Sequence, residues 1–190
     1  MKDAILLHGS SDTPNHFWLP SIKKFLEGKG YSVWTPQLPF PEAPDIKNQL
    51  PFVLNNVTFN NETIIIGHSS SCPLILSILE NINIKINKAI LVAGYARPLD
   101  KMEDDSLRKL EKDAEPILQE TYNWEKIKNN VKDIIFINSE NDPWGCNDKE
   151  GKYMQEHLGG KLIVNREGHM GSEKFNQPYK NFPLLEQLLS

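Results

Sequence analysis

Short apolar runs alternate along the chain with segments whose apolar residues recur at helical spacing. We predict strands over the apolar runs, at 4–7, 31–35, 63–67, 88–92, 133–138 and 162–164. The segments between and after them predict helices, at 17–26, 45–54, 74–79, 124–130, 149–158 and 184–189. The apolar residues of the strands are continuous rather than alternating, which is typical of strands buried on both faces. The pattern therefore predicts an α/β fold with a mainly parallel central sheet and helices on both faces.

Glycine, proline and aspartate mark the ends of several predicted elements. Gly28 ends the first helix, and Asp45 is a candidate N-cap for the second, in which Pro51 predicts a bend or a break. Residues 99–126 are polar and charged. We interpret them as an exposed helical excursion, with a small cap over an active site as the alternative. No internal repeat or linker is visible, so we expect a single domain over residues 1–190.

Composition and charge narrow the class of protein. The 190 residues are 39% hydrophobic and 24% charged, ordinary values for a globular protein with a sizeable core. The net charge is −4, and no block of like charge indicates a nucleic-acid or membrane-binding surface. The apolar run at 4–7 is too short for a signal peptide, and no run approaches the about 20 residues that span a membrane. We therefore expect a cytoplasmic protein that binds neither nucleic acid nor membrane.

The two cysteines, Cys72 and Cys146, give no indication of a metal site, because their spacing fits no metal-binding motif. We interpret both as reduced thiols, which agrees with a cytoplasmic location. A disulfide between them is the less favoured alternative.

The stretch at 63–73 combines a buried strand, a turn of small residues and the start of a helix. Ser69 lies at the apex of the turn, which is the layout of a nucleophile elbow. The usual motif is G-x-S-x-G, and here Gly67 occupies the first position but Ser71 the last. The motif is therefore one residue short, and an ordinary serine-rich turn is the alternative. Ser71 is the position at which we expect any distortion of the elbow.

Two further candidate residues follow later predicted strands. Asp142 follows the strand at 133–138, and His169 follows the last strand. Because the carboxyl ends of parallel strands meet at one edge of the sheet, we expect both residues to lie near Ser69. The chain order Ser–Asp–His is that of α/β hydrolases. In such a triad the histidine takes the proton of the serine and the aspartate orients the imidazole ring.

Rival residues exist for two of these roles. Glu140 and Asp148 compete with Asp142 for the acid, and Asp142 is favoured because it lies directly after the strand. Four other histidines are candidates for structural or peripheral roles. We expect His8 to bond locally, His68 to be structural, His16 to line a pocket and His157 to lie on the surface.

Loops after the first strand and the central strand suggest further parts of the site. The backbone amides of Ser10 and Ser70 are in position to form an oxyanion hole, and each such donor contributes about 3 kcal/mol to catalysis. Aromatic residues in or near the same loops are candidates for an apolar substrate pocket, with core packing as the equal alternative. These are Phe17, Trp18, Phe40 and Trp144.

Four segments of the chain resemble a known family. TIIIGHSS at 63–70, WEKIKN at 124–129, SENDP at 139–143 and Gly168-His169 are similar to the small serine hydrolases of the retinoblastoma-binding protein 9 type. The resemblance runs over most of the chain and is weakest at 99–122. It implies a compact, lid-poor α/β-hydrolase fold whose triad falls on the three residues chosen above. No L-x-C-x-E stretch is present, so the family name gives no reason to infer retinoblastoma binding.

These observations lead to one hypothesis and one alternative. The hypothesis is a serine hydrolase that cleaves a small carboxylic ester or amide through an acyl-enzyme on Ser69, with Asp142 and His169 completing the triad. It needs no metal or organic cofactor, and we expect a monomer or a weak dimer. The alternative is a catalytically weak or inactive hydrolase-fold protein that serves as a protein-binding module.

Overall fold

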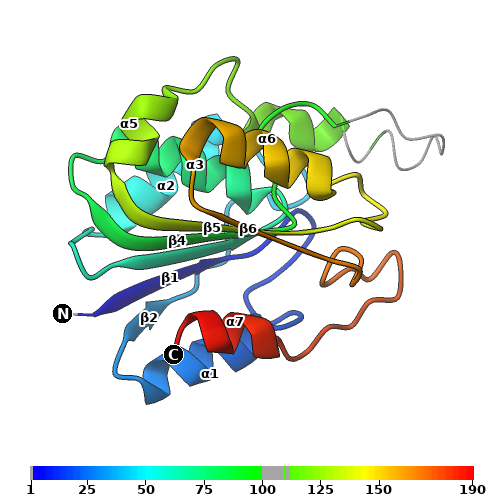
Figure 1. Cartoon of the computed structure of the whole chain (residues 1–190), viewed down its shortest axis with the longest axis horizontal. Coiled ribbons are helices and arrows are strands. Elements are labelled where there is room, and N and C mark those ends of the chain that lie inside the picture. Colours follow the sequence, from blue (N-terminus) through cyan, green and yellow to red (C-terminus); the bar gives the residue numbers. More distant parts are fainter. Residues whose placement is uncertain (1, 100–108, 110–111) are drawn as a thin grey trace.

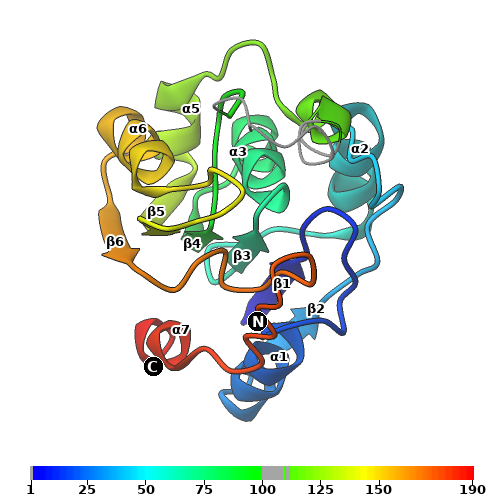
Figure 2. The same ribbon diagram turned by 90° about the vertical axis from the view of Figure 1, so that its right-hand side faces the viewer.

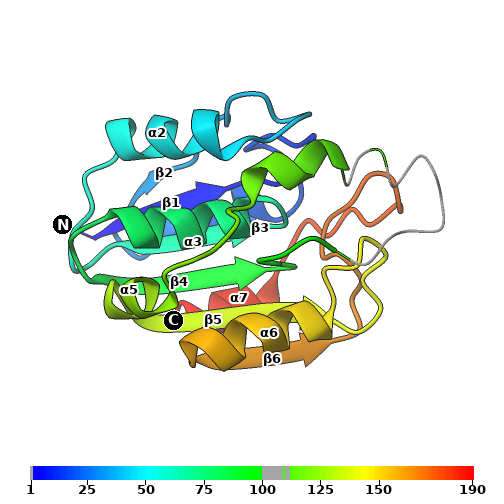
Figure 3. The ribbon, with the colours of Figure 1, turned by 90° about the horizontal axis from the view of Figure 1, so that it is seen from above.

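The computed structural model describes residues 2–99, 109 and 112–190. This part of the chain forms a six-stranded sheet of order β2-β1-β3-β4-β5-β6, and every neighbouring pair of strands is parallel. The predicted parallel sheet is therefore confirmed. Figure 3 shows the strands pointing in one direction, with the loops after β1, β5 and β6 gathered at the edge to which they point. The strands are β1 (Asp3–Leu7), β2 (Ser32–Trp34), β3 (Ile64–His68), β4 (Ile86–Val92), β5 (Val131–Ser139) and β6 (Lys161–Asn165).

Helices cover both faces of the sheet, as the continuous apolar strands require. Helices α2, α3, α5 and α6 lie on one face, and α1 and α7 lie on the other (Figures 1 and 2). None of the helices in the described ranges is long and apolar enough to cross a membrane. The helices are α1 (Leu19–Gly28), α2 (Ile46–Asn56), α3 (Ser71–Asn81), α5 (Trp124–Asn129), α6 (Asp148–Leu158) and α7 (Pro183–Leu188), with a 3-10 turn η1 at Glu115–Ile117.

The core is centred on β3 and the helix that follows it. All five residues of β3 are buried, and α3 is buried from Ser71 to Leu79. The strand needs β-branched residues that pack on both faces, and Ile64, Ile65 and Ile66 supply them. A helix buried around its whole circumference cannot move without disrupting the core, so the turn between β3 and α3 is held from both sides.

The structure differs from the prediction in two details, the course of α2 and the start of α1, and agrees with it on the cap of α2. Helix α2 runs without interruption through Pro51, so the expectation of a break is wrong. Asp45 caps this helix as predicted, since its side chain accepts a hydrogen bond from the amide of Lys47 at 2.8 Å. The first helix begins only at Leu19, because Phe17 has a positive φ of 50° and cannot continue a right-handed helix.

The polar segment at 99–126 is not simply exposed. Residues 100–108 and 110–111 of it lie outside the described residues. In the remainder, Ile117 and Tyr122 are buried, and Ala114, Glu115 and Leu118 line the cavity described below. Lys112, Glu115 and Pro116 are exposed, as the prediction of a solvated excursion requires, whereas the buried Ile117 and the cavity-lining residues agree with the alternative of a small cap.

Candidate active site

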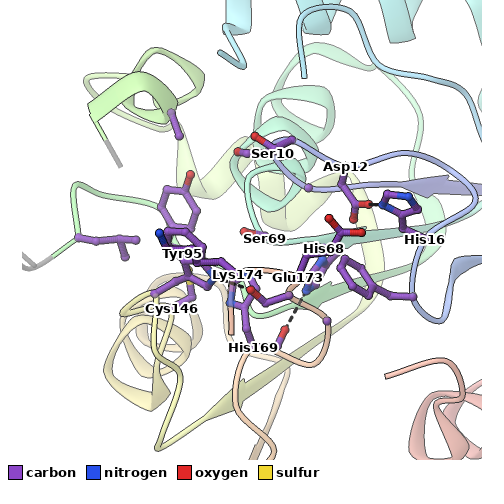
Figure 4. Close-up of a pocket in the computed structure, with 18 of the residues that line it drawn as sticks. Ser10, Asp12, His16, His68, Ser69, Tyr95, Cys146, His169, Glu173 and Lys174 are labelled. Carbon is purple, nitrogen blue, oxygen red and sulfur yellow. Dashed lines mark hydrogen bonds and ion pairs between the residues drawn. The ribbon is translucent and has the colours of Figure 1, made fainter. Parts of the chain in front are cut away.

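A cavity of about 380 Å³ opens at the carboxyl edge of the sheet. Ser10 from the loop after β1, Ser69 from the turn after β3 and His169 from the loop after β6 all line it (Figure 4). The topology accounts for this meeting, because parallel strands bring the loops at their carboxyl ends together. Residues far apart in the sequence therefore share one pocket.

The turn at Ser69 has the backbone strain of an elbow. Ser69 has a φ of 55°, in the left-handed region that non-glycine residues rarely adopt. Its amide donates to the carbonyl of Val92, and its carbonyl accepts from the amide of Cys72, each at 2.9 Å. A Cβ on Gly67 would lie 2.6 Å from Cδ1 of Ile75 and 2.7 Å from Oγ of Ser71, so any larger residue would have to displace these side chains where strand and helix approach. The elbow geometry thus forms despite the incomplete motif.

Ser71, which replaces the usual glycine, is part of what holds this turn. Its side chain is fully buried, and its hydroxyl accepts a hydrogen bond from the amide of His68 at 2.8 Å. The same hydroxyl lies 2.9 Å from the carbonyl oxygens of Leu7 and His68, to which its single proton can donate. Ser71 therefore links β1 to the elbow, a contact that glycine could not make.

Asp142 and His169 form a buried hydrogen-bonded pair. Nδ1 of His169 lies 2.8 Å from Oδ2 of Asp142, and Oδ1 of Asp142 accepts from the amide of Trp144 at 2.8 Å. Both oxygens of the carboxylate are thus engaged, which fixes its orientation. The rival acids lie elsewhere: Glu140 faces Arg166 at the surface, and Asp148 begins α6. Of the three candidate acids, Asp142 is the one that contacts the histidine.

His68 supports the loop that carries His169. Its Nε2 lies 2.8 Å from the carbonyl oxygen of His169, so this nitrogen carries a proton and donates it. Burial, with a smaller contribution from the nearby His169, lowers the pKa of His68 to about 3, so the ring is neutral near pH 7. The prediction of a structural role for His68 agrees with this contact.

The loop after β1, which begins at His8, is held close to Ser69 by hydrogen bonds. A Cβ on Gly9 would lie 3.1 Å from Cβ of Ser69, which places the loop backbone against the elbow. His8 fixes the loop, because its Nε2 accepts from the amide of Leu38 at 2.9 Å and its Nδ1 lies 2.9 Å from the carbonyl of Gly9. Burial lowers the pKa of His8, which keeps Nε2 available as an acceptor. Ser70 is buried at the N-cap of α3, directly after Ser69.

The four predicted pocket aromatics divide into two groups. Phe17 and Trp144 line the cavity. Trp18 does not, because its fully buried ring packs in the core and its Nε1 donates to the carbonyl of Met170 at 3.0 Å. Phe40 does not either, since 65% of it is exposed and it lies outside the cavity. For Trp18 the core-packing alternative was the correct one.

Several lining residues were missed from the sequence. Tyr95 and Cys146 lie in loops after β4 and β5, so their position at the carboxyl edge was a usable signal. Leu118 gives no such signal, because it comes from the polar segment that folds back over the edge. Asp12 lies in the loop after β1, so its place near the carboxyl end of that strand was also a usable signal.

Asp142, Cys146 and His169 form the cluster of potential metal ligands found within the described residues. Their donor atoms all lie within 4.8 Å of one another. The hydrogen bond between Nδ1 of His169 and Oδ2 of Asp142 already uses one donor atom from each of those two residues. The cluster is thus explained by the aspartate–histidine pair, with the thiol of Cys146 beside it.

Comparison with known proteins decides the family. A family model described as serine hydrolase matches residues 4–190. This chain belongs to the serine hydrolase family. The serine hydrolase RBBP9 of Rattus norvegicus is 29% identical to it over 175 residues, which cover 90% of this chain and 87% of the relative. The resemblance to hydrolases of the retinoblastoma-binding protein 9 type is therefore confirmed.

Solved structures support the fold of this serine hydrolase. The crystal structure of the ydeN gene product from B. subtilis matches with a TM-score of 0.84 and 23% identity, over 100% of this chain and 97% of that chain. The esterase EaEST from Exiguobacterium antarcticum matches with a TM-score of 0.67 and 15% identity, over 100% and 92%. At these identities the likeness shows the α/β-hydrolase fold, and the family match shows that the protein is an enzyme, a serine hydrolase.

Proposed function

We propose that this enzyme hydrolyses small carboxylic esters or amides through an acyl-enzyme formed on Ser69. The observation that carries the proposal is the shared cavity, where a strained serine and an aspartate-bound histidine both face the same space. A serine hydroxyl is a weak nucleophile at neutral pH and needs an adjacent base. His169 is that base, because its Nδ1 is engaged by Asp142 and its Nε2 remains for the serine proton.

The reaction follows from these roles in two stages. Oγ of Ser69 attacks the carbonyl carbon while Nε2 of His169 takes the hydroxyl proton, and His169 then returns that proton to the leaving alcohol or amine. In the second stage His169 takes a proton from water, the oxygen of that water attacks the acyl carbon, and His169 returns the proton to Oγ of Ser69 as the acid is released. The amides of Ser10 and Ser70 donate to the negative oxygen that forms in each stage, and removal of one such donor typically costs about 3 kcal/mol.

The pocket limits the substrate to a small molecule with an apolar part. A cavity of about 380 Å³ is at the lower end of ordinary ligand sites. Phe17, Leu118 and Trp144 give it an apolar wall. We propose that this wall holds the acyl chain or the leaving group, with no metal or organic cofactor involved.

A fluorophosphonate probe tests the proposal, because it reacts with an activated serine whatever the natural substrate is. We expect the wild-type enzyme to be labelled and the Ser69→Ala variant to lose both labelling and hydrolysis of p-nitrophenyl esters. A series of esters of graded chain length, with aminoacyl amides in parallel, then defines the preference. Equal labelling of the wild type and Ser69→Ala would contradict the proposal.

A further inference from the structure

A second aspartate, Asp12, lies at the cavity with half of its carboxylate unused. Its side chain is only 5% exposed. Oδ1 accepts from the amide of Thr13 at 2.8 Å and lies 2.6 Å from Nδ1 of His16. Oδ2 is buried and has no hydrogen-bond partner among the residues that the structure describes. A buried carboxylate oxygen without a partner is costly, so this atom points to a ligand.

The surroundings of Asp12 favour a positively charged ligand group. Among the described residues that line the cavity, four are acidic (Asp12, Glu42, Glu115 and Glu173), against one lysine (Lys174) and three histidines (His16, His68 and His169). Glu42 is already held by the hydroxyl of Ser11, at 2.6 Å. Glu173 lies close enough to Asp12 for their charges to repel. A cation between these two carboxylates would relieve that repulsion.

The protonation behaviour of Asp12 agrees with this arrangement. Burial raises the pKa of its carboxyl group, and Glu173 raises it further, whereas the amide of Thr13 and His16 lower it. Burial therefore destabilises the ionised carboxylate of Asp12, and a bound cation would stabilise it.

Asp12 lies at the same cavity as Ser69, so one ligand can contact both residues. Asp12 and Ser10 belong to the same loop, and Asp12, Ser10 and Ser69 line the same cavity. Figure 4 draws Asp12 joined to His16 on the opposite side of the view from Tyr95 and Cys146. A small ligand can therefore place one group at Asp12 while another part lies at Ser69.

We propose that Asp12 is a binding residue for a protonated amine, so that the ligands of this enzyme carry an ammonium group. The proposal deepens the proposed function and rests on it only for the claim that such a ligand is a substrate. An organic ammonium is favoured over a metal ion. Within the described residues the ligand cluster found at metal-binding distances is Asp142, Cys146 and His169, which does not include Asp12.

Binding of two matched small molecules tests the proposal without any turnover. Phenethylamine and 2-phenylethanol share an aromatic body suited to the apolar wall and differ in the charge of one terminal group. We expect NMR titration to show that the wild-type enzyme binds phenethylamine about tenfold more tightly or better, as expected for a charge-assisted hydrogen bond. Equal affinity for the two molecules would overturn the proposal.

Two variants with the same chemical change locate the effect. Asp12→Asn keeps the shape of the side chain and removes its charge, and we expect it to reduce the preference for phenethylamine to nearly none. Asp148→Asn makes the same change outside the cavity and keeps the preference. If Asp12→Asn, checked for folding by circular dichroism, keeps the preference as well, Asp12 is not the binding residue.

Fluorophosphonate labelling of the same samples separates the two proposals. Labelling at Ser69 without an amine preference leaves the hydrolase proposal standing and overturns this one. An amine preference without labelling supports Asp12 as a binding residue and overturns the proposed role of Ser69.

Discussion

Two aspartate–histidine pairs lie at one cavity, and they differ in how each carboxylate is used. The Asp142–His169 pair is buried, with side-chain exposures of 0% and 6%. One oxygen of the Asp142 carboxylate bonds to the ring of His169, and the other accepts a hydrogen bond from the amide of Trp144. In the other pair, His16 is 37% exposed, and Oδ1 of Asp12 takes both local contacts while Oδ2 has no partner among the described residues.

The comparison shows that the environment, rather than the residue types, sets the role of such a pair. A carboxylate with both oxygens engaged cannot turn, so it holds an imidazole ring in one orientation and one tautomer. A carboxylate with an unengaged oxygen at a cavity has capacity for a ligand. The first arrangement suits a general base and the second suits a binding site.

Removal of the carboxylate charge from each aspartate is expected to give the largest difference in kcat between the two pairs. We expect Asp142→Asn to lower kcat for a neutral ester by about 10⁴-fold, because the amide stabilises the wrong imidazole tautomer. Asp12→Asn lowers it by less than about tenfold, since Asp12 does not hold the base. Steady-state kinetics with p-nitrophenyl acetate checks both. Full activity in Asp142→Asn with loss in Glu140→Gln or Asp148→Asn would reassign the acid.

The acid stability of the enzyme tests the neutral state of His68, which anchors the loop of His169. The pKa of His68 is lowered to about 3, against about 6.5 in the unfolded chain. Between these values the unfolded state binds the additional proton, so the free energy of unfolding falls as the pH decreases below 6.5. The loss approaches about 1.4 kcal/mol per pH unit well below pH 6.5, and it totals about 2 kcal/mol between pH 6.5 and 4.5 because the unfolded histidine is only half protonated at pH 6.5.

Urea unfolding of the wild type and two variants at these two pH values measures this loss. His68→Gln keeps an N–H donor for the carbonyl of His169 but cannot titrate, so its acid loss should be smaller than that of the wild type. His157→Gln removes a histidine on the exposed face of α6 and should match the wild type. An unchanged acid loss in His68→Gln would show that other groups cause the effect.

A smaller effect is expected at Ser71, the residue that completes the elbow. Ser71→Ala leaves the buried amide of His68 without its acceptor, which we expect to lower the free energy of unfolding by about 1–3 kcal/mol. Ser77→Ala is a comparison variant in the same helix, where the buried hydroxyl donates to the carbonyl of Pro73 and accepts from the side-chain amide of Gln119 rather than from a backbone amide. Thermal denaturation of the three proteins provides the comparison, and a more stable Ser71→Ala would mean that the hydroxyl strains the turn.

The smallest effect is expected at Phe40, a predicted pocket residue that lies outside the cavity. Phe40→Ala should change kcat/KM for p-nitrophenyl esters by less than about twofold, because surface substitutions away from a site have little energetic effect. Phe17→Ala, at the cavity wall, should raise KM clearly more. A large loss in Phe40→Ala would place the substrate beyond the cavity described here.

Features that depend on local pattern and chain order could be predicted from the amino-acid sequence alone. Continuous apolar strands between helical segments were enough to predict a parallel sheet, because burial on both faces leaves no polar positions. Parallel topology then places the residues after each strand at one edge, which brought Ser69, Asp142 and His169 to the same region as predicted candidates.

Contacts between segments that are distant in the sequence could not be predicted in this way and follow from the folded structure. Trp18 reads as a pocket residue from its loop, but its indole donates to Met170, 152 positions away, and lies in the core. Likewise, the ring of His68 bonds to the carbonyl of His169, 101 positions away. Whether Oδ2 of Asp12 has a hydrogen-bond partner depends on which residues pack around it in the folded protein. Such features depend on packing between elements, which periodicity and motif spacing do not encode.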